Sequence, residues 1–153
     1  MSAVLDNMAI IRTMCESDLD QIMPIEQKAY PYYWSRGIFG DCLRVGYCCQ
    51  VMEMDGLIVG YAIMSKGVGE SHLLNLCIDP GMQGQGLGRL MLDYLIEAAK
   101  RMHSEMLLLE VRPSNTAAIR LYDKTGFNTV GSRNNYYPDG EGREDALILA
   151  KTL

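Results

Sequence analysis

The spacing of apolar and polar residues changes period several times along the chain, and each change predicts a new element. Ala9–Thr13 has the character of a first strand. Ser17 is then positioned to cap a helix whose apolar face begins at Leu19. Pro24 lies within this helix and is expected to kink or divide it. A second helix is predicted to start at Ser35.

The middle of the chain predicts three strands and then a long helix. The strand-like runs are Tyr47–Met54, Leu57–Met64 and His72–Ile78. Asp55–Gly56 joins the first two, and this dipeptide favours a tight hairpin. From Leu87 onward, apolar side chains recur three or four positions apart, which is the spacing of an amphipathic helix.

The last third of the chain returns to strands. Met106–Val111 is a short, nearly continuous apolar run and predicts a buried strand. Asn115 is expected to cap a further helix, which Gly126 ends in a left-handed conformation. Phe127–Ser132 and Ala146–Lys151 are expected to be the closing strands, with a polar loop between them.

The resulting element order is β-α-α-β-β-β-α-β-α-β-β. Hairpins come first and crossover helices later, which predicts an α/β (α+β) fold. Its central sheet is expected to be mixed but mostly antiparallel, with about seven strands flanked by about four helices. The length fits a single domain over residues 1–153, with Met1–Met8 as a flexible tail.

Composition and charge exclude several classes of protein. Apolar residues make up 48% and charged residues 22% of the chain, as in a globular domain. No apolar run approaches the ~20 residues of a membrane span, and no secretory signal is recognisable, so a cytoplasmic location is expected. The net charge of −5 argues against binding nucleic acid and favours a basic partner. The alternative is that the charge merely keeps the protein in solution.

The cysteines and histidines do not form a recognisable metal or disulfide pattern. There are five cysteines and two histidines, with no C-x-x-C pair. This spacing predicts neither a zinc site nor a disulfide framework, and no metal is expected. Most of the cysteines are expected to be small apolar residues in strands.

A glycine-rich segment, DPGMQGQGLGR (Asp79–Arg89), lies between a predicted strand and the long helix. Its glycines allow tight turns and close approach of the backbone to a ligand. The unpaired N–H groups at the start of the helix would suit a pyrophosphate. The segment lacks the lysine of a P-loop and the glycine spacing of a dinucleotide fingerprint. An ordinary glycine-rich loop remains the alternative.

Gln83, Gly86 and Gly88 form a Q-x-x-G-x-G motif that resembles the GNAT superfamily of N-acetyltransferases. The flanking stretches HLLNLCIDP and LGRLMLDYLIEAA match this superfamily too. The resemblance implies acetyl-CoA as co-substrate, with its pantetheine arm along the backbone of one strand and its pyrophosphate among the amides of the loop. The residues implied are Leu76, Cys77 and Ile78 for the arm, and Gln83, Gly84, Gln85, Gly86, Leu87, Gly88 and Arg89 for the pyrophosphate.

Acetyl transfer to an amine requires a base for the amine and an acid for the departing thiol. Glu110 is a carboxylate in an otherwise apolar run, LLLEV, and partial burial would suit it to act as a base. The alternative is a strand-end charge paired with an arginine such as Arg112. Tyr122 carries a phenol, which can donate a proton to a thiolate, although a helix-core aromatic is the simpler interpretation.

The stretch LLLEVRPSNTAAIRLYDKTGF and the ending RNNYYPDGEGREDALILAK resemble the RimI group of this superfamily. The resemblance implies acetylation of the N-terminal alanine of small-subunit ribosomal protein eighteen, whose basic tail would suit an acidic enzyme. It also implies Glu110 as base, Tyr122 as acid and Asn115 as a cofactor contact. The expected mechanism is direct attack in a ternary complex. A covalent route through Cys77 is disfavoured, because no histidine is positioned by sequence to activate it.

The first substrate loop departs from this group, since Tyr33 stands where the group usually has proline before Trp-Ser. Trp34, Tyr136 and Tyr137 are candidates for the walls of a peptide pocket, or else are packing residues. Two alternatives therefore stay open: an acetyltransferase for lysine side chains or small amines, and a non-catalytic acyl-CoA-binding module.

Overall fold

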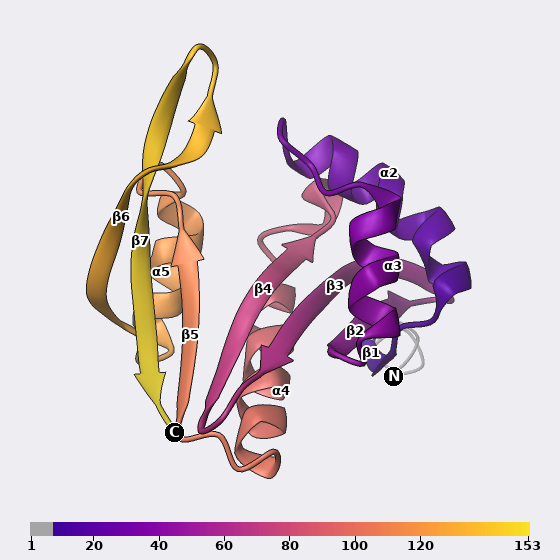
Figure 1. Ribbon diagram of the computed structural model, residues 1–153. Helices are drawn as coiled ribbons and strands as arrows, with labels where there is room; N and C mark the ends of the chain where they lie inside the picture. The colour runs from indigo at the N-terminus through magenta and orange to yellow at the C-terminus, as the bar shows by residue number, and fades with distance from the viewer. Residues whose placement is uncertain (1–7) are drawn as a thin grey trace. The chain divides into compact units, whose positions relative to one another are not determined.

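The structure is a computed structural model that describes residues 8–153 (Figure 1). Its strands are β1 (Ile10–Thr13), β2 (Cys48–Met54), β3 (Leu57–Lys66), β4 (Glu70–Ile78), β5 (Met106–Val111), β6 (Asn128–Asp139) and β7 (Gly142–Thr152). Its helices are α2 (Leu19–Ala29), α3 (Arg36–Arg44), α4 (Leu87–Arg101) and α5 (Thr116–Lys124), with short 3-10 turns η1 (Glu16–Asp18) and η2 (Pro80–Met82). The predicted order of strands and helices is confirmed. Residues 1–7, most of the predicted tail, lie outside the described residues.

The seven strands are hydrogen-bonded in the order β1-β2-β3-β4-β5-β7-β6. The pairs β1–β2, β2–β3, β5–β7 and β6–β7 are antiparallel, whereas β4 and β5 are parallel. The sheet is therefore mixed and mostly antiparallel, as predicted. The chain divides into two compact units, one reaching to Met64 and including Asn75–Leu92, the other formed by Ser65–Leu74 and Asp93–Leu153. Each unit is described by itself below.

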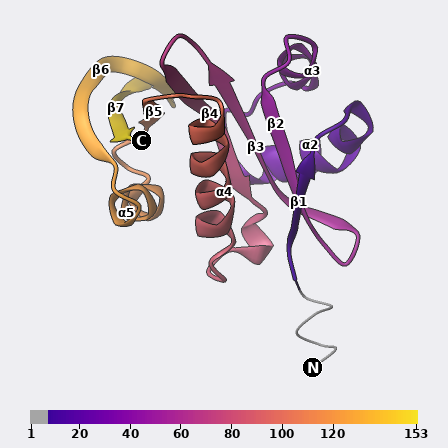
Figure 2. The same cartoon turned by 90° about the horizontal axis from the view of Figure 1, so that it is seen from below.

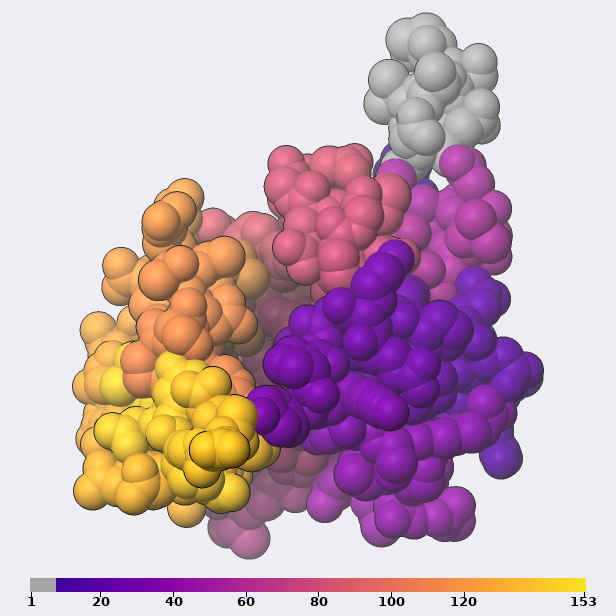
Figure 3. All heavy atoms as spheres, turned by 90° about the horizontal axis from the view of Figure 1, so that it is seen from above, coloured from indigo at the N-terminus to yellow at the C-terminus, as the bar shows by residue number. Residues whose placement is uncertain are grey.

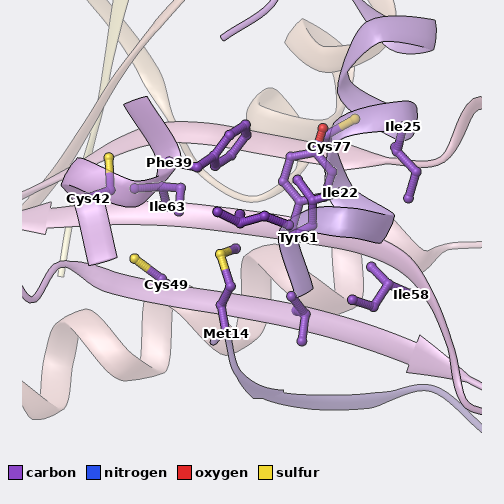
Figure 4. Packing of buried hydrophobic residues seen from close by; sticks show 12 residues of the cluster. Met14, Ile22, Ile25, Phe39, Cys42, Cys49, Ile58, Tyr61, Ile63 and Cys77 are labelled. Carbon is purple, nitrogen blue, oxygen red and sulfur yellow. The ribbon is translucent and has the colours of Figure 1, made fainter. Parts of the chain in front are cut away.

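The first unit packs α2 and α3 against the β2–β3 hairpin. Asp55 and Gly56 form the hairpin turn with φ angles of 54° and 79°, the conformation that a two-residue turn of this kind requires. Buried side chains from the helices and strands meet in one cluster, in which Phe39 and Tyr61 contact each other edge to face (Figure 4). Cys77 of β4 belongs to the same cluster. This cluster fixes the end of β4, from which the glycine-rich segment leaves.

One expectation for the first helix is wrong, and the structure tests another only in part. Ser17 does not cap it, because residues Glu16–Asp18 form a 3-10 turn. Asp18 accepts a hydrogen bond from the Cys15 amide and forms an ion pair with Arg12. Pro24 does not divide the helix, which runs unbroken from Leu19 to Ala29. The Ser35 cap is confirmed, since its side chain accepts a hydrogen bond from the Ile38 amide.

The second unit places α5 beside the ribbon formed by β5, β7 and β6 (Figures 1 and 2). Asn115 caps α5 by accepting a hydrogen bond from the Ala118 amide, as predicted. Gly126 follows the helix with a φ of 94°, and a Cβ there would lie 2.7 Å from Lys151 Nζ. The backbone conformation therefore favours glycine, whereas Lys151 Nζ is the end of a flexible side chain that can move aside.

The polar loop expected between the last two strands is wrong. β6 continues to Asp139 and β7 begins at Gly142, so the segment is a long hairpin whose tip lies on the surface in Figure 3. Its register is interrupted between Arg133 and Tyr137, where Asn135 has a φ of 52°. Side chains support the irregularity, because Asp145 accepts from the Asn135 amide and Arg143 donates to the Asn135 carbonyl.

The five cysteines are all free. Three of them lie in strands, namely Cys48, Cys49 and Cys77, whereas Cys42 lies in α3 and Cys15 precedes η1. Within residues 8–153, no group of His, Cys, Asp and Glu side chains is arranged to hold a metal ion. None of the helices in this range combines the length and hydrophobicity needed to cross a bilayer.

Candidate active site

The glycine-rich segment is held at its start by Asp79. The carboxylate of Asp79 accepts a hydrogen bond from the Gly81 amide at 3.0 Å and pairs with Lys28 Nζ at 2.9 Å. The hydrogen bond from Lys28 lowers the pKa of Asp79. The chain then turns through η2, and α4 begins at Leu87. The first amides of α4 have no acceptor within their own helix, so they are available to an anion.

Gly84 and Gly86 adopt the left-handed conformation, with φ angles of 82° and 81°. A Cβ at either position would have no described atom within 4 Å. The backbone at both residues is therefore open on that side, and residues 83–86 are exposed. Since an open, amide-rich turn before a helix fits a diphosphate, the residues present suit the pyrophosphate of acetyl-CoA.

The end of β4 presents alternate backbone groups to its two sides. The Asp79 amide donates to Val59 of β3 at 2.7 Å. Cys77 has the same parity as Asp79, and a Cβ on Gly60 of β3 would lie only 2.9 Å from the Cys77 carbonyl oxygen. The backbone groups of Cys77 thus face β3, whereas those of Leu76 and Ile78 face the other side, where a pantetheine arm could bind them.

The side chain of Gln83 has a positioning contact that the motif alone did not reveal. Its Nε2 donates to the Ile78 carbonyl at 3.1 Å. This hydrogen bond ties the glycine-rich turn back to the end of β4. Similarly, the Tyr30 hydroxyl donates to the Leu76 carbonyl at 3.2 Å. The carbonyl groups of Leu76 and Ile78 therefore each accept a hydrogen bond from a side chain of the first unit.

Replacing Gly86 with Ala is expected to weaken acetyl-CoA binding by tenfold or more. A left-handed alanine costs about 1–2 kcal/mol, and loss of one charge-assisted hydrogen bond costs about 1.5–3 kcal/mol. Gly46→Ala is the matched control, because Gly46 has a φ of 78° and a Cβ there also meets no described atom. Calorimetric titration should give a weaker Kd for Gly86→Ala only; equal losses in both variants would remove the loop from the binding site.

Glu110 of β5 has partners that sequence reasoning missed. Its Oε1 lies 3.2 Å from His72 Nε2 on β4, and its Oε2 lies 3.8 Å from Arg133 Nε on β6. Only 12% of its side chain is exposed. The alternative of an arginine partner is therefore borne out, but by Arg133; Arg112 pairs with Glu144 at 3.2 Å. Each oxygen of the carboxylate thus has a polar neighbour, and a small part of the side chain remains exposed.

Tyr122 of α5 is buried, with its ring edge to face with Phe127 at 5.5 Å. Burial, followed by the neighbouring Tyr137, raises the pKa of Tyr122. The phenol therefore stays protonated at neutral pH, as a proton donor must. Packing and proton donation are compatible here, because the ring and the hydroxyl serve different purposes.

Tyr136 and Tyr137 of β6 lie close to Glu110 of β5. Their rings meet edge to face at 4.9 Å. A hydrogen bond to Glu110 raises the pKa of Tyr136, and burial raises that of Tyr137 to about 12. Arg112 stacks on the Tyr137 ring at 4.4 Å. Both tyrosines are therefore placed beside the candidate base, within the second unit.

The first substrate loop is anchored by a buried carboxylate, Glu26 of α2. Glu26 is 2% exposed and accepts three hydrogen bonds, from the Tyr61 hydroxyl at 2.7 Å, the Trp34 amide at 2.9 Å and Asn75 Nδ2 at 3.2 Å. The Trp34 ring packs on Phe39 at 5.2 Å. Trp34 therefore contributes to the core of the first unit. The exposed aromatics of the loop are Tyr32 and Tyr33 instead.

Replacing Glu26 with Ala is expected to lower the free energy of unfolding by about 3 kcal/mol. The substitution leaves the buried Tyr61 hydroxyl and the Trp34 amide without their acceptor, at about 1–3 kcal/mol each. For a chain of this length, Tm should fall by roughly 6–12 °C. Glu97→Ala is the control, since Glu97 is an exposed residue of α4 and should change stability by less than about 0.5 kcal/mol. A thermal melt of Glu26→Ala that matches wild type would contradict this account.

The predicted site residues fall into two groups. The first unit contains Trp34, Leu76–Ile78 and Gln83–Arg89, and the second contains Glu110, Asn115, Tyr122, Tyr136 and Tyr137. Within the second unit, Glu110 and the two tyrosines of β6 are close neighbours. Asn115 is exposed, and its side-chain oxygen caps α5.

Known proteins are similar to this chain over nearly its whole length, which includes both groups of residues. Residues 13–127 match the model of the acetyltransferase (GNAT) family. The chain belongs to the GNAT acetyltransferase family. It is 39% identical to the bS18-alanine N-acetyltransferase of Escherichia coli, over 94% of this chain and 97% of the relative. A putative bS18-alanine N-acetyltransferase of Bacillus subtilis is 34% identical over 95% of this chain and 96% of its own.

Solved GNAT structures agree with this assignment. The crystal structure of the E. coli ribosomal-protein-S18-alanine N-acetyltransferase matches with a TM-score of 0.89, covering 95% of this chain and 94% of that one. Ard1 from Thermoplasma volcanium matches with a TM-score of 0.88 at 25% identity, covering 95% and 97%. The predicted resemblance, the fold and the enzyme class are therefore confirmed. The protein is an acetyltransferase whose acetyl donor is acetyl-CoA, and a non-catalytic module is excluded.

Proposed function

We propose that this acetyltransferase modifies the α-amine of an N-terminal alanine, that of ribosomal protein bS18. The observation that carries the proposal is the near full-length similarity to bS18-alanine N-acetyltransferases. The net charge of −5 supports it, because an acidic enzyme attracts the basic tail of a ribosomal protein. We propose the cytoplasm as the compartment, since ribosomal proteins are made there. We also propose that the two units act as one catalytic domain.

The proposed mechanism is direct attack in a ternary complex. Glu110 removes a proton from the substrate's α-ammonium group through a water molecule, which leaves a nucleophilic amine. The amide of Leu76 or Ile78 polarises the acetyl carbonyl, because these amides face away from β3. Tyr122 donates its proton to the departing sulfur, so that a thiol and not a thiolate is released. An α-amine has a pKa ~2.5 units below that of lysine, which makes it the easier group for a carboxylate to deprotonate.

The experiment that tests the proposal locates the acetyl group. A peptide with an N-terminal alanine, a basic sequence and one internal lysine is incubated with enzyme and acetyl-CoA, then fragmented by mass spectrometry. The acetyl group should be found on the α-amine. Glu110→Gln is the control for non-enzymatic acetylation. Transfer to the lysine side chain or to a free polyamine, with the alanine unmodified, would overturn the proposal in favour of a side-chain or small-amine acetyltransferase.

A further inference from the structure

His72 and Glu110 are brought together by the parallel pairing of β4 and β5. His72 lies opposite Leu108 in the register. Because side chains alternate along a strand, Leu108 and Glu110 project from the same face of β5. The imidazole Nε2 reaches Glu110 Oε1 at 3.2 Å. The two residues are 38 positions apart in sequence, and no motif links them.

The groups around this pair differ in what they can do with a proton. Arg133 faces Oε2 of Glu110, and Tyr136 shares a hydrogen bond with the same carboxylate. Tyr137 of the same strand is a further neighbour. Arginine is always protonated, and both tyrosines have a pKa above their usual range. Imidazole is therefore the neighbouring side chain with a nitrogen that can accept a proton.

We infer that His72 completes the general base by holding the proton that Glu110 takes from the amine. This inference rests on the proposed role of Glu110. In the step, the amine nitrogen loses one proton and keeps the electron pair for attack. The proton passes to the carboxylate and from its O–H to Nε2 of the imidazole, in the tautomer whose own proton is on Nδ1. The pair ends as an imidazolium beside a carboxylate, so charge and protons balance.

The chemistry of the three groups explains why a second acceptor is useful. An ordinary α-amino group has a pKa of about 8, an imidazole about 6.5 and a glutamate carboxyl about 4.3. Moving a proton from the amine to a carboxylate alone is uphill by roughly 3.7 units, whereas moving it to an imidazole is uphill by roughly 1.5 units. By these ordinary values, an imidazole accepts the amine's proton more readily than an isolated carboxylate does. The 38% exposure of the His72 side chain then lets the proton leave to solvent after the reaction.

The test is the pH profile of kcat for His72→Gln against wild type. Glutamine keeps a polar amide near Glu110 but cannot gain a proton. The wild-type profile should have an acidic limb, because a base that already carries a proton cannot accept one from the amine. His72→Gln should lower kcat at pH 7 by tenfold or more, and its acidic limb should move to lower pH. His103→Asn is the control for losing a histidine, because asparagine tolerates the φ of 62° at that position.

Two outcomes decide the inference. If His72→Gln retains the wild-type kcat and acidic limb, His72 only orients Glu110 and the inference is overturned. If His103→Asn shows the same displacement as His72→Gln, the effect is not specific and the inference also fails. Every amine acceptor has to lose a proton. The comparison can therefore be made on any amine that the wild type acetylates, so that failure of the alanine peptide alone counts against the proposed substrate and not against His72.

Discussion

Replacing Glu110 with Gln is expected to slow acetyl transfer by roughly 10²-fold or more at pH 7, with the Kd for acetyl-CoA unchanged. Glutamine preserves the size of the side chain and can still contact His72 and Arg133, which lie 3.2 Å and 3.8 Å from the carboxylate oxygens. It cannot take a proton from the substrate ammonium. The substitution therefore removes the base with little change to its surroundings.

The deficit of Glu110→Gln should shrink as pH rises. Above the amine pKa of about 8, the substrate is already deprotonated and the base contributes less. Steady-state kinetics from pH 7 to 9.5 on an alanine peptide would measure this trend. Glu97→Gln is the control, since Glu97 is exposed on α4 and pairs only with Lys100 at 3.4 Å among the contacts of the described residues. A Glu110→Gln enzyme as fast as wild type at pH 7 would eliminate Glu110 as the base.

Replacing Tyr122 with Phe is the second large effect, and it should also slow turnover by roughly 10²-fold or more. The ring contact with Phe127 at 5.5 Å is retained, so the fold should persist. The hydroxyl is lost, and with it the proton for the departing thiolate. Since burial raises the pKa of Tyr122, its phenol is the protonated form throughout the neutral range.

The Tyr122→Phe measurement needs a control for removing a phenol. Tyr94 of α4 has an Arg101 guanidinium 6.0 Å from its ring centre and has no proposed part in the reaction. Tyr94→Phe should therefore keep the wild-type kcat. Thermal melts of both variants would show whether either loses stability. A slow Tyr94→Phe enzyme, or an unaffected Tyr122→Phe enzyme, would contradict the assignment of the acid.

Local signals in the sequence predicted most elements of this fold. The Asp55–Gly56 turn depends on two backbone conformations that these residue types favour, so these two residues are enough to predict the hairpin. The same holds for the helix between Asn115 and Gly126, where a side-chain cap and a left-handed glycine mark the two ends. Such signals act within a few residues, and no tertiary contact is needed to recognise them.

The β6–β7 hairpin could not be predicted in the same way. Most residues of β6 are exposed, so the strand lacks the alternation of apolar and polar side chains that identifies a half-buried strand. Asn135 and the change of register near it interrupt the pattern further. The contacts that hold this irregularity, from Asp145 and Arg143, come from the opposite strand and depend on the fold.

The candidate site shows the same division. The loop Gln83–Gly88 and the carboxylate Glu110 could be found from sequence, because a motif and an acidic residue in an apolar strand are local features. The His72 partner of Glu110 could not, since it depends on the register of β4 against β5. The contact of Gln83 with the Ile78 carbonyl likewise required the turn to be formed.

The central claim is that main-chain amides of Gln83–Gly88 bind the diphosphate of acetyl-CoA, and a calorimetric comparison of two donors tests it most directly. Acetyl-CoA and S-acetylpantetheine carry the same thioester, but the second lacks the diphosphate and the adenosine 3′-phosphate attached to it, so the Gly86→Ala variant is needed to assign the difference to the loop. Wild type should bind acetyl-CoA at least 10²-fold more tightly, and Gly86→Ala should lose affinity for acetyl-CoA only. Equal affinity of the wild-type protein for the two donors, or no binding of acetyl-CoA at all, would contradict the account.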